Sequence, residues 1–233
     1  MHRKIWEWAY IAQALHERGM LVSGRRGLGF AVGREPLAAL FASYGCEIVA
    51  TDLDTTEAQK AGWVQTAQHA AALADLNGRQ ICAPDIFARQ VRFRAADMNS
   101  IPADLVGFDY VWSSCAIEHL GSIASGRRFM KNMMGCLRPG GVAVHTTEFN
   151  VSSDIQTIEK GHDVIFRKSD LLQMAVELLA EGHEFSPFDF RLGEHPIDHV
   201  VDEPPYTGQP HLKLRIGPYV STSFGIIVAR SQI

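Results

Sequence analysis

The sequence has few cysteines, no long apolar run and no excess of positive charge. Its four cysteines are too far apart in the chain for the short spacings of a zinc site or a disulfide framework. No stretch approaches the roughly 20 apolar residues that a membrane span needs, and the N-terminus lacks the apolar stretch and small-residue cleavage site of a signal peptide. We therefore expect a cytoplasmic protein that has no membrane contact.

The charge balance narrows the class of partner. Lys and Arg together number 22 and Asp and Glu 26, which gives a formal net charge of −4. A chain without a broad basic surface is poorly suited to a large nucleic acid, so we expect a small molecule as its partner. The 233 residues, 46% of them hydrophobic, suffice for one substantial core. We expect a single domain over residues 1–233, and composition leaves its oligomeric state open.

A glycine-rich segment at 27–33 is typical of a loop that approaches a nucleotide. Glycine lets the backbone turn sharply and lie close to a ligand, and Arg34-Glu35-Pro36-Leu37 predicts a helix directly afterwards. Residues 46–52 read as a short buried strand that ends in Asp52, 19 residues beyond Gly33. A carboxylate there can accept hydrogen bonds from both ribose hydroxyls, an arrangement that nicotinamide dinucleotides share.

Three later segments distinguish between nucleotide cofactors. Residues 91–98 are expected to form a third strand, ending in Asp97 and Met98, which suit the amino group and ring face of an adenine. Residues 108–115 are expected to form a fourth strand, followed by Glu118-His119. The turn Leu137-Arg138-Pro139-Gly140-Gly141 then precedes a fifth strand.

Over about residues 22–150 this order resembles the class I S-adenosylmethionine-dependent methyltransferases. The resemblance implies an α/β, Rossmann-like sheet of seven mostly parallel strands, with an antiparallel last strand and helices on both faces. A helix at 169–179 and strands at 184–191 and 219–230 would complete it. The implied cofactor is S-adenosylmethionine, and the implied cofactor-binding residues are Gly29, Phe30, Gly33, Asp52, Leu53, Asp97, Met98 and Ser114.

The glycine loop departs from the family pattern. An acidic residue usually lies two positions before the first loop glycine, where this chain has Gly27, and a further loop glycine is Ala31. Glu35 could replace the missing carboxylate, or it could cap its own helix. The sequence leaves both roles open.

The two ends of the chain carry the remaining structural expectations. Residues 1–20 read as an amphipathic helix, which either packs on the sheet or covers the pocket with Trp6, Trp8 or Tyr10. Residues 192–218, rich in Pro, His and acidic residues, are expected to form a substrate-loop insertion.

Methyl transfer requires an aligned acceptor and removal of its proton. At the exit of the fifth strand, His145 is the expected general base, with Glu148 orienting it or binding substrate; a purely structural hydrogen-bond cluster is the alternative. The expected substrate-binding residues are His119, Thr147, Asn150, His195 and Asp198. No metal site is expected, although His119, Glu148, His195, Asp198 and His199 include suitable ligand types.

Two other functions compete with methyl transfer. A nicotinamide-dependent oxidoreductase could use the same glycines and Asp52, but no Tyr-x-x-x-Lys pair follows. A non-catalytic nucleoside-binding module is compatible with the altered loop. The hypothesis we favour is methyl transfer to oxygen or nitrogen of a small polar molecule, with a saccharide first because the expected pocket is rich in His, Thr, Asp and Glu.

Overall fold

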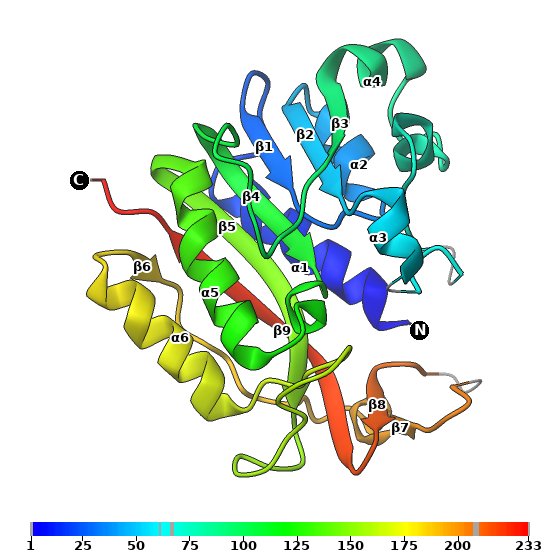
Figure 1. Cartoon of the computed structure of the whole chain (residues 1–233), viewed down its shortest axis with the longest axis vertical. Coiled ribbons are helices and arrows are strands. Elements are labelled where there is room, and N and C mark those ends of the chain that lie inside the picture. The colour runs from blue at the N-terminus through cyan, green and yellow to red at the C-terminus, as the bar shows by residue number, and fades with distance from the viewer. Residues whose placement is uncertain (1, 61, 66–67, 207–209, 233) are drawn as a thin grey trace.

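The structure, a computed structural model, describes residues 2–60, 62–65, 68–206 and 210–232. Within these ranges it contains one sheet of nine strands in the order β3-β2-β1-β4-β5-β9-β8-β7, with β6 pairing to β9 (Figure 1). The strands are β1 Arg26–Gly29, β2 Glu47–Asp52, β3 Val91–Ala95, β4 Phe108–Ser114, β5 Leu137–Asn150, β6 Glu184–Phe185, β7 Val201–Asp202, β8 Lys213–Ile216 and β9 Tyr219–Ala229.

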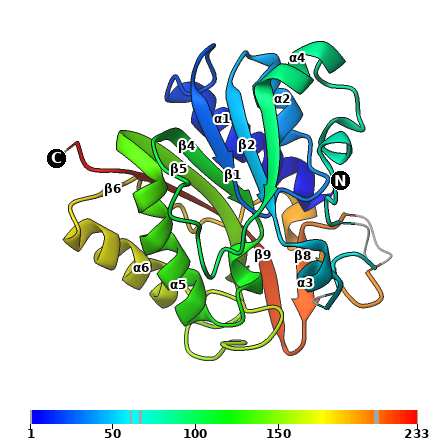
Figure 2. The same ribbon diagram turned by 45° about the horizontal axis from the view of Figure 1, so that its top comes forward.

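Helices cover both faces of the sheet. They are α1 Arg3–Glu17, α2 Leu37–Ser43, α3 Thr55–Lys60, α4 Pro84–Gln90, α5 Ile123–Met133 and α6 Lys168–Ala180. In Figures 1 and 2, α5 and α6 lie on one face while α1 and α2 lie on the other. Each face buries its own apolar cluster, one around Phe129 and Met174 and the other around Phe41 and Trp112. The sheet is therefore the middle layer of three.

The expected fold class is confirmed. Strands β1 to β5 pair in parallel through β3-β2-β1-β4-β5, and β9 runs antiparallel to β5 from Val142–Ala229 to Asn150–Ser221. The strand count exceeds the expected seven because residues 192–218 contribute β7 and β8 to the edge. The expected sixth strand is shorter than 184–191, since only Glu184–Phe185 pairs with β9.

The two glycines of β1 make room for aromatic side chains of β4. A Cβ built on Gly27 would lie 2.5 Å from Tyr110 Cε2, and one on Gly29 would lie 2.5 Å from Val32 Cγ1 and 2.7 Å from Trp112 Cε2. Both aromatic residues are fully buried. These glycines therefore serve close packing between neighbouring strands, a role that glycine in a strand commonly has.

Replacing Gly29 by Ala should lower the free energy of unfolding by about 1–3 kcal/mol, the usual cost of overpacking a rigid core. Chemical denaturation of the variant would measure this loss. Gly135→Ala is the matched control, because a Cβ there meets no atom within 4 Å. Equal stability of the two variants would contradict the packing role of Gly29.

Candidate active site

A cavity of about 520 Å³ lies where the carboxyl ends of β1, β2, β3 and β4 meet the start of α1. Ligands of open α/β sheets bind in this crevice, and the volume lies within the usual range for a small-molecule site. Six of the eight expected cofactor-binding residues line it: Gly33, Asp52, Leu53, Asp97, Met98 and Ser114. The sheet topology thus gathers residues that are up to 81 positions apart in the sequence.

Asp52 is held by the backbone of the loop around it. Its Oδ2 accepts hydrogen bonds from the N–H groups of Gly33 (3.1 Å) and Ala70 (3.2 Å), and its Oδ1 accepts one from Leu53 (2.8 Å). Burial raises the pKa of Asp52, and these donors, together with nearby His69, only partly offset it. A carboxylate has about four acceptor positions, so Asp52 keeps capacity for a ribose hydroxyl.

Gly29 and Phe30 do not line the cavity. Phe30 is fully buried and makes an edge-to-face contact with Phe129, with ring centroids 5.3 Å apart. Gly29 faces Trp112, as described above. Both residues belong to the core beneath the loop, and their expected contact with the cofactor stays a prediction.

The first helix supplies a wall of the cavity that sequence reasoning left undecided. His2, Arg3, Lys4 and Trp8 all line it. Lys4 Nζ lies 2.9 Å from Glu7 Oε2 and donates a hydrogen bond to the Ser114 carbonyl at 3.4 Å. Trp6 and Tyr10 line a second cavity instead. Of the three aromatic residues considered as a cover, Trp8 alone lines the first cavity.

Glu148, expected in catalysis, is a buried partner of α1. Its Oε1 lies 2.5 Å from Arg3 Nη1, and its Oε2 accepts a hydrogen bond of 2.5 Å from the Ser221 hydroxyl. The residue is 3% exposed and does not line the cavity. We correct its expected role accordingly: Glu148 lies beneath the pocket and neutralises Arg3.

His145 is sealed in the core between β5 and α5. Its Nδ1 lies 2.7 Å from the Ser113 hydroxyl, and its ring makes an edge contact with Phe129. No part of the residue is exposed, and burial lowers its pKa to about 3. An imidazole without access to the cavity cannot take a proton from an acceptor there, so the general-base expectation for His145 is corrected.

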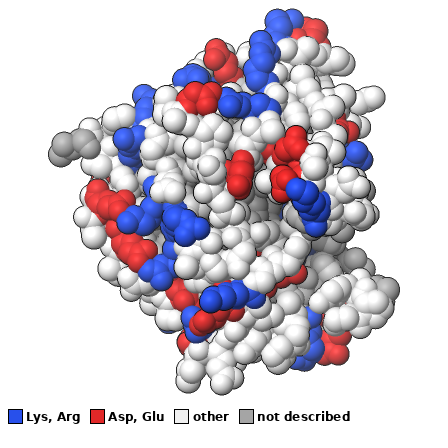
Figure 3. Space-filling model, viewed as in Figure 1, with Lys and Arg blue, Asp and Glu red and all other residues white. Residues whose placement is uncertain are grey.

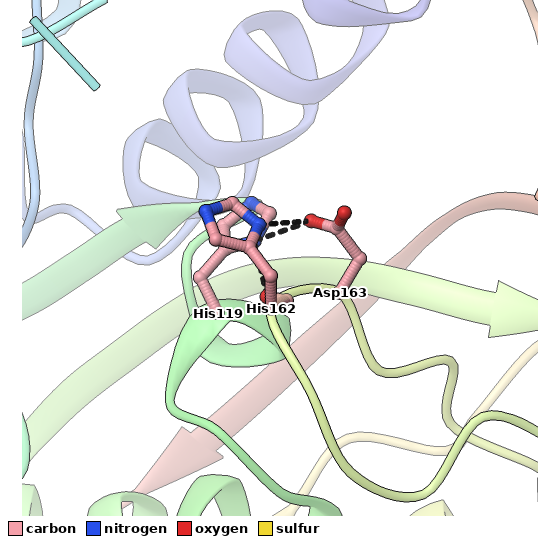
Figure 4. Close-up of side chains that lie close together, drawn as sticks. All are labelled: His119, His162 and Asp163. Atoms are coloured by element: carbon pink, nitrogen blue, oxygen red, sulfur yellow. Dashed lines mark hydrogen bonds and ion pairs between the residues drawn. The ribbon is translucent and has the colours of Figure 1, made fainter. Parts of the chain in front are cut away.

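His119 lines the cavity, and its imidazole contacts a carboxylate. It ends the short 3-10 helix Ile117–His119 that follows β4, and its Nδ1 lies 2.9 Å from Asp163 Oδ1 (Figure 4). His162 Nδ1 lies 3.0 Å from the same oxygen. Burial alone would lower the pKa of His119, but the hydrogen bond to Asp163 and the charge of Glu118 outweigh it and raise the pKa.

Trp63 packs on both imidazoles, with ring centroids 4.5 Å from His119 and 4.8 Å from His162. Trp63 also lines the cavity. The donor atoms of His119, His162 and Asp163 lie within 4.8 Å of one another. This grouping differs from the metal-ligand alternative considered from the sequence, in which His119 was combined with Glu148 and residues 195–199.

His211 reaches the cavity from the 192–218 insertion. Its Nδ1 lies 2.5 Å from Asp202 Oδ2, its ring stacks on His2 with centroids 4.4 Å apart, and its carbonyl accepts a hydrogen bond from the Arg3 backbone. Asp202 is buried. The single signal in the sequence was the density of His and acidic residues in this insertion.

The other expected substrate-binding residues lie away from the cavity lining. Thr147 is buried and donates a hydrogen bond to Glu118 Oε2 at 3.0 Å. Asn150 orders the following loop through its contacts with Ser152, Ser153, Gln156 and Thr157. His195 and Asp198 belong to an exposed turn around the 3-10 helix Pro196–His199, where Asp198 accepts from the His195 backbone. Asp198 lines the second cavity.

Comparison with known proteins agrees with this site. Residues 28–145 match the family model described as a methyltransferase domain. The structure is similar to an S-adenosylmethionine-dependent methyltransferase from Mesorhizobium loti, with a TM-score of 0.58 and 14% identity over 94% of this chain and 96% of that one. It is also similar to magnesium protoporphyrin IX methyltransferase from Synechocystis PCC 6803, solved with bound S-adenosylhomocysteine, with a TM-score of 0.57 and 10% identity over 96% and 82% of the two chains.

A third similar structure is the [4+2]-cyclase SpnF, with a TM-score of 0.56 and 18% identity. The similarity covers 77% of this chain and 59% of the cyclase. At these identities the likenesses show the fold. Among curated proteins, the comparison finds no match to this sequence. No helix in the described ranges is long and apolar enough to cross a bilayer.

Proposed function

Because the chain belongs to the S-adenosylmethionine-dependent methyltransferase family, we propose that it transfers a methyl group to oxygen or nitrogen of a small polar molecule. The supporting observation is one cavity that combines the expected adenosine residues Asp52, Asp97 and Met98 with imidazoles, among them His119 and His211, which each have a carboxylate on Nδ1. The sulfonium cofactor supplies the activated methyl group. The protein then has to align the acceptor and accept its proton.

Either imidazole is suited to accept that proton. A carboxylate on Nδ1 fixes the tautomer in which Nε2 carries the lone pair, and both His119 and His211 have such a carboxylate. We propose His119 as the base, because it follows Ser114 and Cys115 at the end of β4 and has a raised pKa. His211 then faces the acceptor from the insertion. This assignment replaces the one expected for His145.

A small acceptor also fits the charge pattern of the surface. On the face drawn in Figure 3, positive and negative side chains are interspersed. A nucleic-acid site would instead require positive residues grouped on one face. Imidazoles, carboxylates and Asn99 around the cavity favour a hydroxylated acceptor, so saccharides are the first class to test. With all four cysteines unpaired, we propose the cytoplasm as its compartment.

The test is a screen with S-adenosylmethionine carrying a labelled methyl group, against saccharides, phenols and amines, with NADH binding measured in parallel. For the acceptor found, His119→Ala should reduce turnover by about 10²–10⁴-fold, the usual contribution of a general base, while S-adenosylhomocysteine binding is unchanged. Since the pKa of His119 is raised, turnover should fall as the pH drops through a value above 6.5, where the imidazole becomes protonated.

The exposed His199 provides the control. It belongs to the 192–218 insertion, as His211 does, but it does not line the cavity. Full turnover of His119→Ala together with a strong loss in His211→Ala would move the base to His211. Full turnover in both variants would remove His119 and His211 from the chemistry. Labelling of nucleic acid and of no small molecule would contradict the proposed acceptor class.

A further inference from the structure

Strand β1 has no room for the carboxylate that the family usually carries two positions before the first loop glycine. At this position the chain has Gly27, and any side chain there would overlap the ring of Tyr110. Tyr110 is fully buried in the apolar cluster that includes residues of α1 and α2. A charged group for the methionine end must therefore come from another element of this chain.

Glu35 is a carboxylate at the cavity wall that does not cap its own helix. Helix α2 has Pro36 as its N-cap residue, and no side-chain hydrogen bond caps it. Glu35 lines the cavity, and its Oε2 is buried without a hydrogen-bond partner among the described residues. A buried carboxylate oxygen without a partner is costly, which indicates that a donor absent from the protein itself belongs there.

The groups around Glu35 come from α1 and β4. Burial raises the pKa of Glu35 to about 7, and the charge of Lys4, the Ser114 hydroxyl and the Trp8 indole oppose that rise, whereas Glu7 adds to it. The indole nitrogen of Trp8 is likewise buried without a hydrogen-bond partner. The same wall of the cavity thus contains a buried carboxyl oxygen and a buried indole N–H, neither of which has a hydrogen bond of normal geometry among the described residues.

Lys4 provides the opposite charge at the same wall. Its side chain is 27% exposed, and its ammonium is held by Glu7 and the Ser114 carbonyl. An ammonium group has three hydrogen-bond donors, and the two named contacts leave one of them available. Arg3 is less available to bind an anion, since the carboxylates of Glu148 and Glu7 both lie within salt-bridge distance of its guanidinium.

We propose that Glu35 binds the α-ammonium group and Lys4 the α-carboxylate of the methionine end of S-adenosylmethionine. The cofactor end is a zwitterion, and charge-assisted hydrogen bonds of opposite sign on one wall bind and orient such a group. This inference rests on the proposed use of the cavity for the cofactor. It makes the first helix a part of the cofactor site, and the orientation of the sulfonium depends on it.

The test compares two ligands by calorimetric titration: S-adenosylhomocysteine and 5′-methylthioadenosine, which has the adenosine and sulfur but no amino-acid end. Glu35→Gln keeps the shape of the side chain and removes its charge. It should weaken S-adenosylhomocysteine binding at least tenfold and change methylthioadenosine binding less than twofold. Lys4→Met should show the same difference, with Glu57→Gln and Lys60→Met as exposed controls.

Three results would overturn the inference. One is unchanged S-adenosylhomocysteine affinity in Glu35→Gln. Another is an equal loss for both ligands, which indicates a general distortion of the cavity. If the unaltered protein binds methylthioadenosine and S-adenosylhomocysteine equally, the cavity is a nucleoside site but has no zwitterion subsite. Binding of neither ligand would overturn the cofactor site itself, so the two failures are distinguishable.

Discussion

Replacing Glu7 by Ala should lower the free energy of unfolding by about 3–5 kcal/mol, because removing one partner of a buried ion pair leaves the other charge uncompensated. Glu7 is fully buried although it lies on a surface helix. Its Oε2 is 2.9 Å from Lys4 Nζ, and its Oε1 accepts a hydrogen bond of 2.5 Å from the Ser223 hydroxyl. Ser114 donates to Glu7 as well, at 3.2 Å. The substitution would leave both hydroxyls without this acceptor and Lys4 without its ion-pair partner.

The sign of the pH dependence follows from the same contacts. Burial alone would raise the pKa of Glu7, but Lys4, the Ser223 hydroxyl and Arg3 outweigh it and lower the pKa to about 2. A carboxylate whose folded pKa is depressed stabilises the fold above its unfolded pKa of about 4.3 and loses this contribution as the pH falls toward 2. The stability difference between the unaltered protein and Glu7→Ala should therefore shrink in that pH window.

Thermal unfolding followed by circular dichroism would measure the effect. For a chain of this size, a loss of this magnitude lowers the melting temperature by roughly 10 °C. Glu17→Ala is the control on the same helix, because Glu17 is exposed and an exposed substitution changes stability by only about 0.5 kcal/mol. If Glu7→Ala and Glu17→Ala had the same melting temperature, the buried network would not hold α1 on the sheet.

Asp52→Ala should weaken S-adenosylhomocysteine binding by at least about 100-fold, which corresponds to about 2.7 kcal/mol. Two effects add. The variant loses the charged acceptor for the ribose hydroxyls, and a hydrogen bond to a charged group contributes about 1.5–3 kcal/mol. It also releases the N–H groups of Gly33, Leu53 and Ala70, which Asp52 now holds in place.

Asp52→Asn separates these two effects. The amide keeps one acceptor oxygen for the loop but removes the charge, so binding should be intermediate between the unaltered protein and Asp52→Ala. Asp54→Ala is the control, since Asp54 is exposed two residues further along. The measurement is calorimetric titration of each variant after its fold has been checked by circular dichroism. Unchanged affinity in Asp52→Ala would place the ribose elsewhere.

Local patterns of the sequence determined the order and type of the main elements. The buried strand 46–52 and the acidic strand end at Asp52 are found as expected, since a continuous apolar run followed by a polar residue is typical of a parallel strand and its exit. The helix at 169–179 and the antiparallel strand at 219–230 appear as α6 and β9. Carboxyl ends of parallel strands share one edge, which brings Asp52, Asp97 and Ser114 to one cavity.

The residues whose expected roles differ from the structure lie along β5, and their surroundings depend on where this strand ends. Local sequence places the strand exit at His145, whereas β5 continues to Asn150, paired with β4 as far as Thr146 and with β9 along its whole remaining length. Successive side chains of a strand point to opposite faces, so His145 and Thr147 face α5 while Glu148 faces α1. The extent of pairing between distant strands is a tertiary property, and local sequence does not encode it.

What the sequence by itself determined is the family, the sheet and the strand ends that line the cavity, because these depend on motifs within short segments. What only the tertiary structure decided is the opposite wall. His2, Lys4 and Trp8 come from one end of the chain and His211 from near the other, and they meet because α1 crosses the sheet and His2 pairs with His211. The environments of Glu7 and Glu35 follow from that same contact: a charged residue on a helix is expected in solvent until another element buries it.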